Sequence, residues 1–239
     1  MDKVMQSKKA VLLVLGGVAL AALAAVPRGV VLLGSQGWGS LLLNLGTEMA
    51  GVVGAYFLFE MVLGGMRRRE ARKMRLITQM GSPESSLAKE AAQSLRSDGW
   101  LYDGSLQEAN LVGANLRGAD LSKASLGKAD LRYGELNDAN LSEADLRGAN
   151  LGKADLSGAN LHGADLRGAN LREASLAGAD LLGANLARAD LSGADLNAAN
   201  LLQADLSGVV LEDAYVSNER LAQARSLKGA PLPDGTKHD

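Results

Sequence analysis

The chain has 239 residues, with 25 lysines and arginines against 27 aspartates and glutamates, so its formal net charge is −2. Glycine is abundant at 29 residues and aromatic residues make up only 3%, a composition typical of repeat proteins rather than of an ordinary globular core. The chain has no cysteine, which excludes disulfide bonds, thiolate catalysis and cysteine-ligated metal sites. The charge is uneven, because residues 106–215 hold 9 basic and 16 acidic side chains and therefore carry −7.

Two apolar segments predict a transmembrane hairpin within residues 1–66. Residues 10–26 are apolar throughout, and 17 residues is near the lower limit for crossing a bilayer. Residues 40–63 form a second, longer run that few polar residues interrupt. The first run is also open to interpretation as a cleaved signal peptide, because Lys8 and Lys9 precede it and Ala22-Leu23-Ala24 within it resembles a cleavage site. We expect the two-helix hairpin.

Polar side chains inside the second run are candidates for a membrane function. Glu48 lies a third of the way into this run, where a charge costs about 2.5–3.5 kcal/mol on insertion scales. It is a candidate for an ion path or proton site, or else a protonated group bonded to a neighbouring helix, with Asn44 one turn away. Glu60 lies near the predicted interface, where it can pair with an arginine. Small residues four apart, such as Gly46, Ala50 and Gly54, favour helix pairing and a homo-oligomer, although they are also simply common in membrane helices.

A basic cluster follows the second run directly. It consists of Arg67, Arg68, Arg69, Arg72, Lys73 and Arg75. Such a cluster marks the cytoplasmic end of a span and attracts anionic lipid headgroups, so these six side chains are predicted to contact the membrane surface. We therefore expect an integral membrane protein, of the bacterial inner membrane or an equivalent one, with both termini and the repeats in the cytoplasm. Nucleic-acid binding is not expected, because no aromatic residues are interleaved.

Residues 67–99 are predicted to be helical and to cover the first edge of the segment that follows. The second membrane helix should continue to about Gln79. A capped helix should then begin after Ser82, with Pro83 at its first position and Gly99 just past its end.

A five-residue repeat occupies residues 100–216. Leucine recurs at every fifth position from Leu106 to Leu211, which makes 22 pentads, and alanine precedes it by two positions in 19 of them. The exceptions are Gly104, Gly134 and Val209. Period five fits neither a helix nor a flat strand, but a chain that turns at every pentad directs both alanine and leucine inward. One pentad cannot bury its leucine alone, so stacked coils are predicted.

These A(D/N)LxG pentads resemble the pentapeptide-repeat family over about half of the chain. The resemblance implies a right-handed quadrilateral β-helix with four pentads in each coil, an inward leucine ladder and about 5.5 coils in all. It also implies that residues 217–239 form a C-terminal cap, with a helix near 218–227 and a tail. Together with the N-terminal hairpin and the short capping helices, this is the predicted β-class fold.

A coil of four pentads places residues twenty apart above one another. Asn150 should stack on Asn170. Asp145 and Asp165 should also stack, each neutralised by the arginine two positions later. Leu182 and Leu202 should form an outward apolar strip, and we expect the C-terminal helix rather than a partner to cover it.

Catalysis is not expected, because the two histidines are isolated and the repeat lacks metal-ligand spacing, so neither cofactor nor metal is predicted. The leading hypothesis is a membrane-anchored, non-enzymatic scaffold that binds an unidentified protein. Its candidate partner surface is Arg117, Arg132, Arg147, Arg167, Arg172, Leu182 and Leu202. An oligomeric channel or effector gated by the repeats is the alternative. A topoisomerase-binding DNA mimic, which the family resemblance also suggests, is less favoured because arginines dilute the negative charge.

Overall fold

The computed structural model describes residues 37–231, and it describes side chains from residue 51 onward. The first predicted membrane segment, residues 10–26, and the end of the predicted tail, residues 232–239, lie outside these described residues. The chain divides into two compact units, one that ends at Arg68 and one that begins at Arg69.

Helix α2 (Gly37–Met80) has 44 residues and continues without a break past the basic cluster, as the sequence predicts. In the first unit its described side chains are mostly exposed, and large apolar ones are among them: Phe57, Leu58 and Met61 are 61–67% exposed.

Within the described part of the chain, no helix is both long and apolar enough to cross a membrane. The predicted second span, residues 40–63, is therefore not supported.

Helix α3 (Ser85–Ser97) starts two residues later than the sequence predicts. Its N-cap residue is Glu84, and Ser82 instead accepts a hydrogen bond from the Glu84 N–H at 3.1 Å through its hydroxyl. The Ser82 carbonyl accepts from the Asn115 N–H at 2.9 Å, which ties this loop to the first coil and keeps it out of the helix. The predicted end is confirmed, because Gly99 has a φ of +75° and lets Trp100 N–H reach the Leu95 carbonyl at 2.8 Å.

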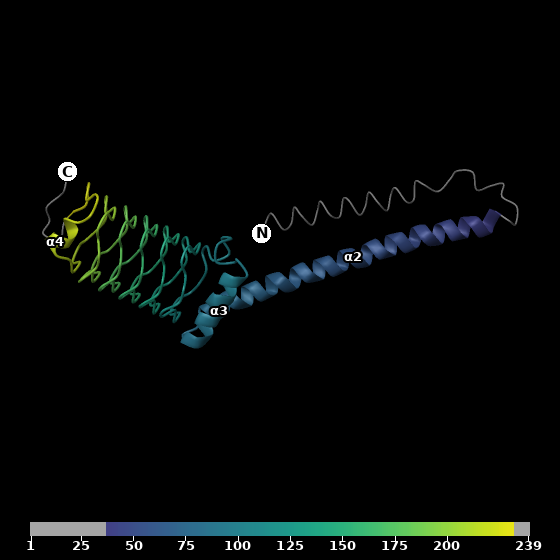
Figure 1. The fold of residues 1–239 in the computed structure, drawn as a ribbon, viewed down its shortest axis with the longest axis horizontal. Helices are drawn as coiled ribbons and strands as arrows, with labels where there is room; N and C mark the ends of the chain where they lie inside the picture. Colours follow the sequence, from purple (N-terminus) through teal and green to yellow (C-terminus); the bar gives the residue numbers. More distant parts are fainter. Residues whose placement is uncertain (1–36, 232–239) are drawn as a thin grey trace. The chain divides into compact units, whose positions relative to one another are not determined.

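The two ends of the repeat segment are covered differently. Helix α3 buries Ala88, Ala91, Ala92 and Leu95 in the same apolar core as the first leucines of the repeat, so it closes that end. The opposite end carries the short helix α4 (Asn218–Leu221), in which Leu221 is buried. Figure 1 shows the coils stacked between these two helices.

Each coil of the repeat segment takes twenty residues. Parallel one-residue bridges join Asn110 to Asp130, Asp130 to Asn150, and so on to Asp195 and Tyr215, each with a separation of twenty residues. Four pentads therefore make one coil, as the resemblance to the pentapeptide-repeat family implies. The bridges are isolated, because the chain turns before a longer strand can form.

One pentad, Leu146–Asn150, shows how the backbone is satisfied. The N–H groups of Leu146, Gly148 and Asn150 donate to neighbouring coils at 2.8–3.0 Å, and the Ala149 N–H closes a turn on the Leu146 carbonyl at 3.0 Å. The remaining N–H, that of Arg147, donates to the side chain of Asp145 at 3.2 Å. The frequent Asp or Asn before leucine is thus the acceptor that the turn needs.

The turn also requires a left-handed backbone conformation at the second residue after each leucine. In every pentad φ is positive at this residue and negative at the residue before it. Together with the hydrogen bond from the N–H of the following residue to the leucine carbonyl, this defines a type II turn. Glycine is favoured at such a position, as at Gly148 and Gly168, each with a φ of 64°.

Leucine and alanine form the core. All leucines of the ladder, from Leu106 to Leu211, are at most 1% exposed. The predicted irregularity at Gly134 and Glu135 neither bends nor interrupts the coils, because Glu135 keeps its bridges to Asn115 and Asp155. The predicted amide stacking is also confirmed, since Asn170 Nδ2 donates to Asn150 Oδ1 at 3.0 Å.

The C-terminal helix is shorter than predicted. After α4, residues 226–230 form a further pentad, in which Ser226 bridges Asp205 and the Ala230 N–H closes its turn on the Leu227 carbonyl. This pentad is one residue out of phase with the leucine ladder, because both Arg225 and Ser226 pair with the previous coil, as in a β-bulge. Because of this shift, the pentad at 226–230 does not continue the five-residue spacing of the leucines.

Removing one acceptor should destabilise the coil measurably. Asn185 Oδ1 accepts from the Ala187 N–H at 3.1 Å, so we expect Asn185→Ala to lower the free energy of unfolding by about 1 kcal/mol in urea titrations. Asn185→Asp keeps the acceptor and should be less destabilised than Asn185→Ala by that bond, although its carboxylate stacks between Asp165 and Asp205 and meets their repulsion. Ser175→Ala is the matched control, because Ser175 makes no such bond to Ala177 among the described residues. Equal losses for Asn185→Ala and Ser175→Ala would contradict the assignment.

Candidate interaction surface

The twenty-residue coil sorts the surface into four corners, one for each pentad of a coil. A corner is defined here by its column of residues that directly follow the leucines. The first corner holds Val112, Arg132, Gly152, Arg172, Ser192 and Glu212. The second holds Arg117, Asn137, Ser157, Ala177 and Asn197. The third holds Ser122, Ser142, His162, Leu182 and Leu202. The fourth holds Gln107, Gly127, Arg147, Arg167, Ala187 and Ser207.

The charge of the repeat segment differs between corners. For this count, each pentad contributes the residue before its leucine and the two turn residues after it. The first three corners together then hold 5 basic and 12 acidic side chains within residues 106–215. The fourth corner holds 4 of each. The whole excess of −7 therefore lies on three corners, and the fourth is neutral.

The predicted partner residues do not form one surface. Arg117 lies on the second corner, Arg132 and Arg172 on the first, Arg147 and Arg167 on the fourth, and Leu182 and Leu202 on the third. The arginines of the first two corners are also engaged with carboxylates. These ion pairs are Arg117–Asp138 at 3.5 Å, Arg132–Asp130 at 2.7 Å and Arg172–Asp190 at 3.1 Å.

The two stacked arginines of the fourth corner are held by bidentate pairs, as the sequence predicts. Arg147 donates to both oxygens of Asp145 at 2.7–2.8 Å. Arg167 holds Asp165 in the same way, with its shortest bond at 2.6 Å. Hydrogen bonding by Arg147 lowers the pKa of Asp145 below its ordinary value, although partial burial opposes the shift. Each arginine is therefore fixed in direction while its outer side remains exposed.

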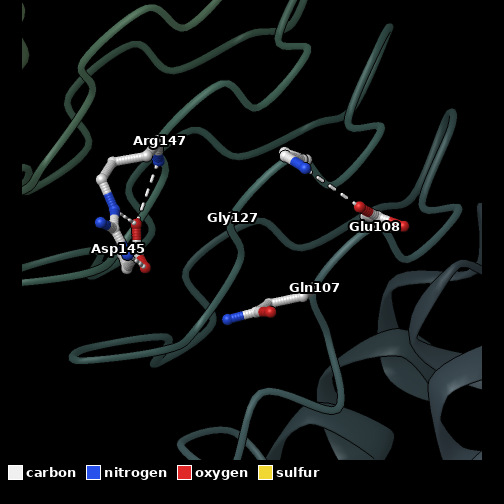
Figure 2. Close-up of a pocket in the computed structure, with 6 residues that line it drawn as sticks. Gln107, Glu108, Gly127, Asp145 and Arg147 are labelled. Carbon is white, nitrogen blue, oxygen red and sulfur yellow. Dashed lines mark hydrogen bonds and ion pairs between the residues drawn. The ribbon is translucent and has the colours of Figure 1, made fainter.

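Two open hollows lie along the fourth corner where its column has a small residue. The first has a volume of about 300 Å³ around Gly127, between Arg147 and the ion pair of Lys128 with Glu108 at 3.3 Å (Figure 2). The second has a volume of about 680 Å³ around Ala187, and both stacked arginines line it together with Arg188.

Arg188 and Lys128 are not among the partner residues that the sequence predicts. They stand at the second turn position, which was treated as variable, and only an alignment of the pentads at twenty-residue spacing would have placed them beside Arg147 and Arg167. The register of the coils therefore contains the signal that was missed.

The prediction that the C-terminal helix covers the strip of Leu182 and Leu202 is wrong in the described structure. Leu182 is half-buried, but Leu202 is 46% exposed. The reason is that α4 ends at Leu221, and the residues after it form a pentad on the fourth corner rather than a longer helix. The exposed strip is reduced to one leucine.

The basic cluster is only partly available to a membrane surface. Arg69, Arg72 and Lys73 all lie 5.4–5.7 Å from the ring centroid of Trp100, a cation–π arrangement. Lys73 also pairs with Asp103 at 3.1 Å. These three side chains fasten the end of α2 to the repeat unit. For Arg67, Arg68 and Arg75, contact with lipid stays a prediction.

The intramembrane candidates remain untested. Asn44 and Glu48 lie in the part of α2 whose side chains are not described, whereas Glu60 is exposed. Among the described residues, no group of three or more His, Cys, Asp or Glu side chains lies close enough together to hold a metal ion.

The chain matches one family model, described as pentapeptide repeats, in 8 copies over residues 104–132, 135–172 and 174–213. Among solved structures, it is 38% identical to HetL, a pentapeptide repeat protein involved in heterocyst differentiation regulation from the cyanobacterium Nostoc sp. strain PCC 7120. That match covers 55% of this chain and 69% of HetL, with a TM-score of 0.37.

Two further solved structures extend the comparison. Rfr23, a pentapeptide repeat protein from the cyanobacterium Cyanothece 51142, is 31% identical over 45% of this chain and 91% of its own, with a TM-score of 0.39. QnrB1, a plasmid-mediated fluoroquinolone resistance protein, is 20% identical over 52% of this chain and 75% of its own, with a TM-score of 0.30. A comparison with curated proteins gave no match.

The Asp–Arg pairs predict a stability that depends on acid pH. Hydrogen bonds from Arg132 and Arg147 lower the pKa of Asp130 and Asp145, so these groups stabilise the fold above about pH 3.8 and cease to do so as the pH falls through their lowered values. We expect the urea midpoint to hold between about pH 7 and 5 and to fall below about pH 4. Arg147→Met should make the decline shallower. A midpoint that is constant down to about pH 2 would contradict the coupling.

Proposed function

We propose that this chain, which belongs to the pentapeptide-repeat family, is a non-enzymatic scaffold that binds a partner protein through the fourth corner of its repeat segment. The observation that supports this most strongly is the contrast between the corners. Three corners hold 5 basic and 12 acidic side chains, while the fourth is balanced and carries both hollows. The fourth corner therefore does not repel an acidic partner as the other three would, and its arginines offer N–H donors of fixed direction.

The construction of the coils supports the choice of a scaffold. The core leucines and alanines and the Asp or Asn acceptors fix the fold, whereas the two turn residues of each pentad vary freely. A binding surface can therefore be built on a corner without disturbing the ladder.

A DNA-mimic role is less well supported by the distribution of charge. The acidic excess is spread over three corners, and it is interrupted there by paired arginines such as Arg132 and Arg172. A mimic of duplex phosphates needs a continuous negative surface, because phosphate charges are closely and regularly spaced.

Attachment to a membrane through residues 1–66 is part of the same proposal. Its support is the apolar sequence of residues 10–26 and the exposed apolar side chains of α2, among them Phe57 and Met61, followed by the basic cluster. The cluster predicts the cytoplasmic side of the membrane.

Site-specific photo-crosslinking in cells tests the proposed surface. Ala187 and Ala177 occupy the same turn position on the fourth and second corners, and both are half-buried, so they form a matched pair for a photoreactive residue. We expect one discrete crosslinked species from position 187, in the membrane fraction, and none from position 177. Crosslinking at position 177 alone would contradict the fourth corner, and a species confined to the soluble fraction would contradict the attachment.

A further inference from the structure

The larger hollow of the fourth corner gathers three arginines around a space that small residues leave open. Arg147 and Arg167 stack above Ala187 in one column, and Arg188 stands beside it. Its volume of about 680 Å³ lies within the range of ligand clefts, about 300–1,000 Å³.

Arg188 stands at a turn position that favours glycine. It has a φ of 61° at a turn position where its neighbours in the column, Gly168 and Gly208, are glycines. A residue with a side chain is disfavoured in this conformation relative to glycine. The three lysines at the same turn position elsewhere each pair with a carboxylate one coil away: Lys123 with Glu143, Lys128 with Glu108 and Lys153 with Glu173, at 3.3–3.5 Å. Among the described residues, Arg188 forms no ion pair.

The other two arginines are oriented but not saturated. Each guanidinium has five N–H donors, and the bonds of Arg147 to Asp145 use only those on Nε and Nη2. Arg167 engages Asp165 through the same two nitrogens. Their side chains are 51–54% exposed, so the remaining N–H groups stay accessible to a ligand. Pairing with aspartate thus fixes the direction of two donors without consuming them.

The local charge selects the ligand. Three arginines against Asp145 and Asp165 leave an excess of one positive charge at the hollow. A single carboxylate neutralises this excess, and its two oxygens match the paired N–H donors that a guanidinium presents. We propose that the hollow binds a glutamate or aspartate carboxylate of an acidic segment in the partner protein, with Arg188 as the principal donor. This inference rests on the proposed scaffold function and names the chemistry of its partner.

Fluorescence anisotropy with the full-length chain and a labelled hexaglutamate peptide tests the inference. We expect saturable binding that weakens as salt is raised, because exposed charges are screened. Arg188→Gly should weaken it tenfold or more, as expected for losing a charge-assisted bond. The variant restores the glycine of the column, so it should unfold at an equal or higher urea concentration. Lys123→Gly is the matched control, because it removes a paired cation at the same turn position on the third corner.

The outcomes separate this inference from the proposed function. Unchanged affinity in Arg188→Gly, or an equal loss in Lys123→Gly, would overturn the site. Absence of hexaglutamate binding to the unaltered chain would overturn it as well. Tighter binding of a labelled twelve-nucleotide single-stranded DNA than of hexaglutamate would overturn the assignment to a carboxylate. Crosslinking at position 187 without hexaglutamate binding would leave the scaffold intact and reject only the acidic partner.

Discussion

The need to satisfy the backbone N–H groups of a five-residue turn governs this protein. Neighbouring coils and the turn itself provide acceptors for four of the five donors, and the side chain of the residue before leucine provides the fifth. Aspartate and asparagine are short enough to reach the N–H two residues on, which explains why they recur without taking part in chemistry. A five-residue repeat with no reactive group is therefore sufficient to build the stacked coils.

The same requirement divides the sequence between fold and function. Once leucine, alanine and the polar acceptor are fixed, only the two turn residues of each pentad remain free, and the twenty-residue coil arranges them into four corners. The chain uses this freedom unevenly. Acidic residues accumulate on three corners, while the fourth keeps equal charges and gathers Arg147, Arg167 and Arg188 around an open hollow. The proposed function follows from that distribution rather than from any single motif.

Much of the repeat architecture can be predicted from the sequence, because period five with a constant leucine has few physical solutions. The inward leucines follow from it, whereas the register of four pentads in each coil, and with it the neutralisation of the stacked Asp145 by Arg147, comes from the resemblance to the pentapeptide-repeat family. The end structures cannot be predicted so well. Ser82 is an adequate helix cap by its residue type, but its carbonyl accepts a bond from the first coil instead. The last pentad is shifted by one residue and so escapes a periodic search.

The candidate surface shows a similar division. Sequence reasoning finds the stacked arginines, but it treats all exposed positions as equivalent and so joins residues that lie on different corners. It also misses Arg188, whose backbone conformation is visible only in three dimensions. The basic cluster after the apolar segments has a second role that composition does not reveal, because the fold brings Trp100 against Arg69, Arg72 and Lys73.

Amide hydrogen exchange, resolved to single residues, is the most direct test of the central claim. The N–H groups of Arg147, Arg167 and Ala187 donate to Asp or Asn side chains. Glu135, Ser175 and Val210 stand before a leucine in place of Asp or Asn. The N–H groups two residues after them, those of Asn137, Ala177 and Glu212, have no such bond among the described residues. The account predicts slow exchange in the first set and fast exchange in the second. Equally fast exchange in both, with the leucine amides still protected, would show that the side-chain acceptors do not hold the turns.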